Sequence, residues 1–188
     1  MHDQPSPTEP EPAASHPNGR NVILTGFMGT GKTTVGRLLA DRLGFEFVDT
    51  DTLIESRHGP IPGIFREHGE GGFRRLEREV ADELAGRGRL VISTGGRLMV
   101  DDANAARLAA TGEVFCLTAT VDTILARVAA DGGATERPLL AGDDVRDRIT
   151  GLLAERAAAY GRFRQIDTEG RSPAEIVEQI AGELTRRA

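Results

Sequence analysis

Short apolar runs alternate with segments of helical periodicity along most of this chain. The runs have the length of buried strands and lie at residues 21–25, 45–48, 89–93, 113–117 and 164–167. Apolar residues elsewhere recur at helical spacing and predict helices near residues 32–43, 52–57, 71–86, 101–110, 121–130, 144–160 and 173–186. Such alternation is typical of an α/β fold with helices on both faces of a parallel sheet. We therefore expect a three-layer domain around a five-stranded parallel sheet.

The beginning of the chain departs from this pattern. Five prolines lie among Ser, Glu, Ala and His in the first twenty residues, and a segment of that kind buries too little apolar surface to order itself. We predict a disordered Pro-rich tail at residues 1–20 and one folded domain at residues 21–188. The whole chain has 188 residues, which is enough for a single domain with a real core.

Charge and cysteine content narrow the classes of partner. The net charge of −6 argues against nucleic acid, because proteins that bind polyanions are usually basic. The only cysteine, Cys116, lies in an apolar run; it excludes an internal disulfide and fits a reducing compartment. Neither a membrane-spanning stretch nor the apolar core of a signal peptide is evident. We expect a cytoplasmic monomer without membrane partners.

The turn after the first predicted strand carries the clearest chemical signal. Residues 26–33 match G-x-x-x-x-G-K-[ST], and they stand between a strand and a helix, as a phosphate-binding P-loop requires. Glycines let such a loop wrap around phosphate oxygens, which the N–H groups of the helix N-terminus attract. Lys32 is expected to reach the β- and γ-phosphates of ATP, and the Thr33 hydroxyl to hold Mg²⁺. The predicted ATP-binding residues here are Gly29, Thr30, Gly31, Lys32, Thr33 and Thr34.

Two carboxylates follow the second predicted strand. Ligands of open parallel sheets bind beyond the carboxyl ends of the strands. Asp49 and Asp51 point the same way if the chain stays extended, so that one can hold Mg²⁺ and the other can bind or deprotonate a substrate hydroxyl. A structural alternative exists, because Thr52 and Glu55 have the spacing of a helix-capping box. The adjacent P-loop favours the functional interpretation.

Two predicted helices place arginine close to an apolar stripe. On the helix near 71–86, Glu77 lies near the stripe, and Arg74 is three positions away as a partner; the alternative is a solvated set of charges. On the helix near 144–160, Arg156 falls in the middle of the stripe. An inward arginine suits bidentate carboxylate recognition, unless its side chain extends to solvent.

Loops carry the remaining candidates. Gly95 and Gly96 follow the third strand and allow close approach to a ligand, although a plain turn is the alternative. Arg137 follows a Gly-rich stretch that we predict to be a mobile lid, from which an arginine can stabilise a transferring phosphoryl group. Arg171 and Pro173 precede the last helix and are placed to border the nucleotide base.

Together these residues resemble the shikimate kinase family, which belongs to the nucleoside-monophosphate-kinase-like group of P-loop proteins. The resemblance covers about residues 21–187 and rests on Gly26–Thr34, Asp49–Asp51, Phe73–Glu77, Gly95–Gly96, Arg137–Leu140, Arg156 with Tyr160, and Asp167–Thr168 with Pro173. It implies a P-loop NTPase fold and ATP-dependent phosphorylation of the 3-hydroxyl of shikimate, with Mg²⁺, in aromatic amino-acid biosynthesis.

The resemblance also implies residue roles. Arg74 and Arg156 would hold the shikimate carboxylate, Asp51 would bind its hydroxyls, and Gly95 and Gly96 would line the same site, with Gly96 lending its backbone N–H. The other implied roles are Mg²⁺ binding by Thr33 and Asp49, catalysis by Lys32, Asp51 and Arg137, and adenine contacts by Arg171 and Pro173.

Two positions depart from the family pattern. Arg97 replaces the third glycine after the third strand, where its side chain would clash with the substrate, point away from it, or add a contact to an anionic one. Ala129 and Ala130 stand where many relatives carry an arginine near adenine, so adenine stacking is expected to be weaker or differently built.

Two other functions stay open at this point. Arg97 suggests a related kinase for another small hydroxy acid or polyol, such as gluconate. The second is a non-catalytic nucleotide-binding module that binds a partner through its tail. This alternative is opposed by the presence of all four expected kinase residues, Lys32, Thr33, Asp49 and Arg137.

Overall fold

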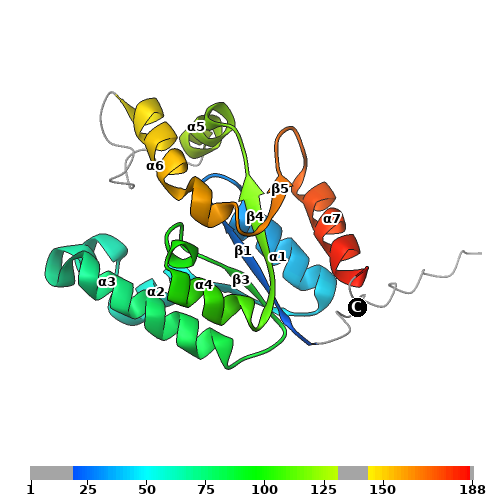
Figure 1. Cartoon of the computed structure of the whole chain (residues 1–188), viewed down its shortest axis with the longest axis horizontal. Helices are drawn as coiled ribbons and strands as arrows, with labels where there is room; N and C mark the ends of the chain where they lie inside the picture. The colour runs from blue at the N-terminus through cyan, green and yellow to red at the C-terminus, as the bar shows by residue number, and fades with distance from the viewer. Residues whose placement is uncertain (1–18, 131–143, 187–188) are drawn as a thin grey trace, which may run out of the picture.

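The fold is built on one parallel sheet, in a computed structural model that describes residues 19–130 and 144–186. Its strand order is β2-β3-β1-β4-β5, and every pairing is parallel (Figure 1). The strands are β1 Asn21–Gly26, β2 Glu46–Asp49, β3 Leu90–Ser93, β4 Gly112–Thr118 and β5 Arg164–Asp167. The five-stranded parallel sheet expected from the sequence is confirmed.

Helices connect the strands and account for most of the remaining described residues. They are α1 Lys32–Leu43, α2 Thr50–His58, α3 Ile61–Ala85, α4 Asp102–Ala109, α5 Val121–Ala130, α6 Val145–Tyr160 and α7 Pro173–Thr185, with a short 3₁₀ helix, η1, at Leu98–Val100. No described helix has an apolar stretch long enough to cross a membrane.

Helix α3 differs most from the prediction, because it begins at Ile61 and not near residue 71. Its backbone leaves the helical region at Gly69, with φ 65° and ψ −175°, so it consists of two helical segments joined at a kink. Glycine has a low helix propensity, and the glycines of the first segment make this helix difficult to recognise from the sequence. Burial of Ile64 against the neighbouring core holds this segment in place.

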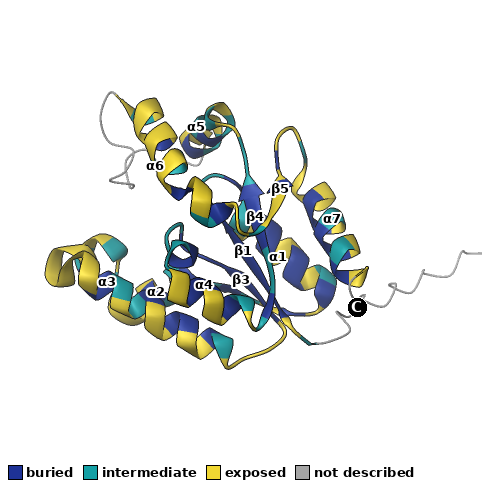
Figure 2. Cartoon of the chain, viewed as in Figure 1, coloured by how far each residue is buried: buried dark blue, intermediate teal, exposed yellow. Residues whose placement is uncertain are grey.

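The sheet is buried between two helical layers. Alternate residues of β1 face opposite sides: Leu24 packs in the cluster formed with α1 and α7, whereas Ile23 packs in the cluster formed with α2, α3 and α4. Figure 2 shows β1 and β3 as buried and the outer faces of the helices as exposed, whereas the edge strands β2 and β5 contain exposed residues. A third cluster, between α5 and α6, contains Phe27 from the segment after β1. The three-layer prediction is confirmed.

Strand register brings three loops together at one edge of the sheet. Leu24 of β1 is level with Ser93 of β3, and Asp49 of β2 is level with the same Ser93. The segments that follow β1, β2 and β3 therefore begin side by side. These segments contain the P-loop, the two aspartates and the paired glycines that the sequence singled out.

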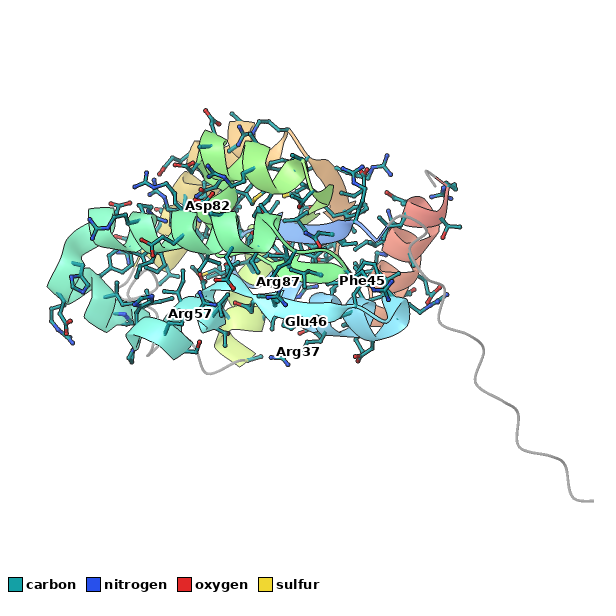
Figure 3. The ribbon with its side chains drawn as sticks, turned by 90° about the horizontal axis from the view of Figure 1, so that it is seen from below. Arg37, Phe45, Glu46, Arg57, Asp82 and Arg87 are labelled. Carbon is teal, nitrogen blue, oxygen red and sulfur yellow. The ribbon has the colours of Figure 1, made fainter. Side chains whose placement is uncertain are left out.

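Two ion pairs away from this edge of the sheet are exposed to solvent. Arg57 pairs with Glu83 at 2.6 Å and Arg87 pairs with Glu46 at 2.6 Å, on the side of the molecule drawn in Figure 3. Exposed pairs of this kind contribute about 0–1 kcal/mol each. Cys116 is buried, as expected, and burial raises the pKa of its thiol to about 11, so it stays protonated and unreactive at neutral pH.

Candidate active site

The P-loop depends on glycine at three positions. Gly26 has φ 128°, and a Cβ there would lie 2.2 Å from the Leu117 carbonyl oxygen. Gly29 and Gly31 have φ 73° and 93°, which L side chains rarely adopt. The loop is also bound to itself, since the hydroxyl of Thr30 donates to the Phe27 carbonyl at 2.8 Å. The result is a fixed turn that ends at the N-terminus of α1.

Side chains at the start of α1 face the end of β2. The Lys32 ammonium donates to the Phe27 carbonyl at 2.9 Å. Thr33 and Thr34 are exposed, and the Thr33 hydroxyl lies 3.0 Å from Asp49 Oδ2. Ser93 adds a second hydroxyl at 3.0 Å from the same oxygen. A carboxylate flanked by two hydroxyls offers the hard oxygen donors that Mg²⁺ prefers.

The helix start at Asp49 differs from the sequence interpretation. Asp49 is the N-cap of α2, and its Oδ1 accepts hydrogen bonds from the backbone N–H groups of Asp51 and Thr52. The structural alternative, a helix that begins here, is observed, but the capping box between Thr52 and Glu55 is not formed. Thr52 already lies inside the helix, and Glu55 accepts a hydrogen bond from the backbone N–H of Ile61 instead. Asp51 stands in the first turn of α2, so the expected extended geometry is also wrong.

Asp51 occupies a half-buried, electrostatically unusual position. Burial, helped by the nearby charges of Asp49 and Glu77 and opposed by Lys32, raises its pKa from 3.8 to about 6. A Cβ on Gly95 would lie 2.3 Å from Asp51 Oδ1, so glycine at that position leaves room for the carboxylate. An acid with a pKa near working pH is suited to accept a proton from a substrate hydroxyl.

Arg74 is held by acidic neighbours on its own helix. It forms a charged hydrogen bond with Glu77, which is only 2% exposed. Burial raises the pKa of Glu77, and Arg74 opposes that shift. The pairing expected from their spacing is confirmed. Nε and Nη2 of Arg74 donate to the exposed Glu70, so acidic side chains hold both sides of the guanidinium.

Arg156 points inward from α6 and is 3% exposed, which excludes the snorkelling alternative. Its Nη1 donates to the Gly96 carbonyl at 3.2 Å, and its Cζ lies 5.3 Å from the centre of the Phe27 ring. Tyr160 donates to the same carbonyl at 2.6 Å. Within the described part of the chain, Arg156 Nε is buried without a hydrogen-bond partner. This guanidinium is therefore held beside the P-loop with a donor that an acceptor group can satisfy.

Arg127, on α5, is a residue that sequence reasoning missed. Its guanidinium donates to the Gly29 carbonyl of the P-loop at 3.2 Å and to the Thr168 carbonyl, after β5, at 2.9 Å. It lies two positions before Ala129, where an arginine was sought. Nothing in the local apolar pattern marks it, because its partners come from distant segments.

The remaining predicted residues have mixed placements. The Arg171 guanidinium donates to Gln179 at 2.6 Å and to the Asp167 and Glu175 carbonyls, which ties it to the base of α7. Pro173 is exposed at the first position of α7. Arg137 and the predicted lid lie outside the described residues.

The fold and this site define a P-loop kinase. A glycine loop ends at a helix N-terminus, and an acid of raised pKa follows the neighbouring strand β2. Arginines from two helices border the segment after β3: Arg156 binds the Gly96 carbonyl, and Arg74 shares Glu70 Oε1 with Arg97. The chain belongs to the shikimate kinase family, whose model matches residues 28–185.

Individual relatives agree with this assignment. A shikimate kinase of Geobacter metallireducens is 45% identical, with 89% of this chain and 93% of the relative covered. The structure of Acinetobacter baumannii shikimate kinase in complex with shikimate matches with a TM-score of 0.83 and 36% identity, over 90% of this chain and 95% of the other. A gluconokinase from Sinorhizobium meliloti, with a TM-score of 0.63 and 18% identity over 90% of this chain and 94% of the other, shares the fold.

Proposed function

We propose that this chain transfers the γ-phosphoryl group of ATP to the 3-hydroxyl of shikimate, forming shikimate 3-phosphate for aromatic amino-acid biosynthesis. The observation that supports the proposal is a chain of contacts around the segment after β3: Asp51 lies against Gly95, and Arg156 donates to the Gly96 carbonyl. Arg74 pairs with Glu77, whose charge acts on Asp51. A small acid with hydroxyls needs both a carboxylate-binding cation and a hydroxyl-facing carboxylate. Family membership supports the same acceptor.

Different acceptor residues bind different groups of shikimate. Arg74 and Arg156 bind its carboxylate, because a guanidinium group matches the geometry of a carboxylate. Asp51 accepts a hydrogen bond from the 3-hydroxyl and takes its proton on an Oδ as the phosphoryl group arrives. Gly95 leaves the space that Asp51 needs, and Gly96 supplies a backbone N–H.

The nucleotide residues position the other reactant. P-loop N–H groups from Gly29 to Thr34 surround the phosphates. The Lys32 ammonium leaves the Phe27 carbonyl and moves to the β- and γ-phosphates. Arg137 stabilises charge on the transferring group. Adenine lies against Arg171 and Pro173, and Arg127 stands at the junction between that loop and the P-loop.

Magnesium fits the donor set at the end of β2. Asp49 and the hydroxyl of Thr33 provide hard oxygen ligands, and Ser93 steadies the carboxylate. At this position Mg²⁺ would neutralise negative charge on the phosphates of ATP. We further propose that the enzyme works as a cytoplasmic monomer without nucleic-acid or membrane partners, in line with its acidic charge and single buried cysteine.

A coupled assay of ADP release tests the function. We expect release that depends on shikimate, with shikimate 3-phosphate identified by ³¹P NMR, and little release with gluconate. Release with gluconate and none with millimolar shikimate would replace this proposal with the polyol alternative. Lys32→Met is the matched control for catalysis, because it removes the phosphate-directed charge and leaves the acceptor residues in place.

A further inference from the structure

Arg97 stands where the family pattern has a third glycine, and the structure explains why a side chain is tolerated there. Its φ of −115° is ordinary for any L residue, so the backbone does not require glycine. The side chain is 41% exposed and extends between two helices. Its Nη1 lies 3.8 Å from Glu70 Oε1 on α3 and 3.9 Å from Glu155 Oε1 on α6.

The charge of Arg97 also affects two residues, Glu77 and Tyr160, that contact or lie beside the acceptor arginines. Its charge is among the influences that lower the pKa of Glu77 and of Tyr160, although burial raises both overall. Glu77 holds Arg74, and Tyr160 binds the Gly96 carbonyl beside Arg156. Arg97 is thus close to both of the arginines that we assign to the acceptor carboxylate.

Glu70 links Arg97 to the same site through one oxygen. Glu70 Oε1 accepts hydrogen bonds from Nε and Nη2 of Arg74, both at 3.3 Å, and it is the oxygen nearest to Arg97. The Gly69 kink ends the first segment of α3 just before it. A carboxylate of the protein therefore already occupies the position where an acid bound by both guanidinium groups would stand.

Glu70 and Glu77 hold Arg74 with very different strength. The Glu77 side chain is 3% exposed, whereas the Glu70 side chain is 59% exposed and its hydrogen bonds are long. Exposed ion pairs contribute little and are readily replaced, whereas a buried pair is costly to break. Glu77 is thus a permanent partner and Glu70 an exchangeable one.

We propose that Glu70 is an internal counter-ion that occupies Arg74 and Arg97 until the carboxylate of the acceptor displaces it, and that Arg97 is a third guanidinium directed at that carboxylate. Arg97 then determines specificity by favouring acids over neutral polyols. This inference rests on the proposed function, because it requires a carboxylated acceptor. On this proposal, the arginine that replaces glycine at position 97 adds a contact to the acceptor carboxylate.

A simpler role for Arg97 is a latch that joins α3 to α6. Glu155 separates the two ideas, because it contacts Arg97 and not Arg74. Loss of either glutamate would weaken a latch in the same direction. Only the loss of Glu70 would free both arginines for the acceptor.

The experiment compares full-length wild type with Glu70→Gln, Glu155→Gln and Arg97→Gln. Steady-state ADP release is measured with shikimate and with its neutral carboxamide, and shikimate binding without ATP is measured by calorimetry. Glu70→Gln should lower KM and Kd for shikimate about threefold to fivefold, the factor that an exposed ion pair supplies, with kcat unchanged. Glu155→Gln should leave KM within about twofold, because it does not release Arg74.

Arg97→Gln should raise KM for shikimate about threefold to fivefold and leave that for the carboxamide unchanged. Equal changes in Glu70→Gln and Glu155→Gln, or unchanged KM and Kd in Arg97→Gln, would overturn the inference. Absence of shikimate turnover by the wild type would overturn the proposed function. The calorimetric Kd values for shikimate would then still decide the roles of Glu70 and Arg97. Absence of shikimate binding would reject the proposed function and this inference together. Thermal melting shows that each variant is folded.

Discussion

The nucleotide half and the acceptor half of this site are built by different means. The centre of the nucleotide half is the P-loop, one continuous segment in which backbone conformation decides the shape, through the positive φ angles of Gly26, Gly29 and Gly31. The acceptor half is assembled from side chains on separate helices, and each of its cations already has a partner within the protein. Arg74 is held by Glu77, and Arg156 by the Gly96 carbonyl.

This difference has a consequence for substrate binding. A backbone cradle needs no rearrangement of charges before it receives phosphates, apart from the movement of Lys32 away from Phe27. Acceptor-side guanidinium groups exchange or share partners when a carboxylate arrives, so their energetics depend on every neighbouring charge. We therefore expect side-chain changes in the acceptor half to alter the KM of the acceptor and leave that of ATP unchanged.

Asp51→Asn should have the largest effect, because it removes the proton acceptor that lies between the two halves. We expect kcat to fall about 10²–10⁴-fold, with the Kd for ATP unchanged in calorimetry. The variant should also be more stable at pH 8 by up to about 3 kcal/mol, since the raised pKa means that burial disfavours the ionised carboxylate. A matching loss of ATP affinity would show that Asp51 belongs to the nucleotide half.

Arg156→Ala should have the next largest effect, on the KM for shikimate. Removing a buried charged hydrogen bond costs about 2–5 kcal/mol, so KM should rise about 30-fold or more, with the KM for ATP unchanged. Tyr160→Phe is a matched control, because it removes the other donor to the Gly96 carbonyl without removing a charge. It should change KM only about threefold to fivefold. An unaltered KM in Arg156→Ala would remove this residue from the acceptor site.

The pH profile should separate the two halves without a mutation. The pKa of Asp51 is raised to about 6, so its ionised form is lost as pH falls through 6, and not only near 3.8. We expect kcat/KM for shikimate to fall about tenfold per pH unit below that value, because a protonated carboxyl accepts no proton. Calorimetric ATP binding over the same range is the control. A profile that is flat down to pH 5 would contradict the role of Asp51.

The same contrast explains what the sequence could predict. The P-loop, with the strand before it and the helix after it, follows from local pattern, so the phosphate-binding part of the nucleotide half was predictable. The order of the strands was not predicted, because it depends on pairing between distant segments. Inward placement of Arg156 was predictable because a cation in an apolar stripe has few alternatives. The start of α2 was not, because Asp49 competes with Thr52 for the same cap. Arg127 and Glu70 were not, because their partners or their roles depend on long-range packing.

Arg127→Ala should have the smallest effect, and it should change the KM for ATP rather than the KM for shikimate. Arg127 joins the Gly29 carbonyl to Thr168, so its loss should loosen the nucleotide half and raise the KM for ATP about fivefold, the factor that about 1 kcal/mol supplies. The KM for shikimate should not change, because no acceptor residue contacts Arg127 among the described residues. Arg42→Ala is the matched control, since its guanidinium forms an exposed ion pair with Glu178 on α7 and has no role in the site. A rise in the shikimate KM of Arg127→Ala would mean that the two halves move together, and the division between them would then fail.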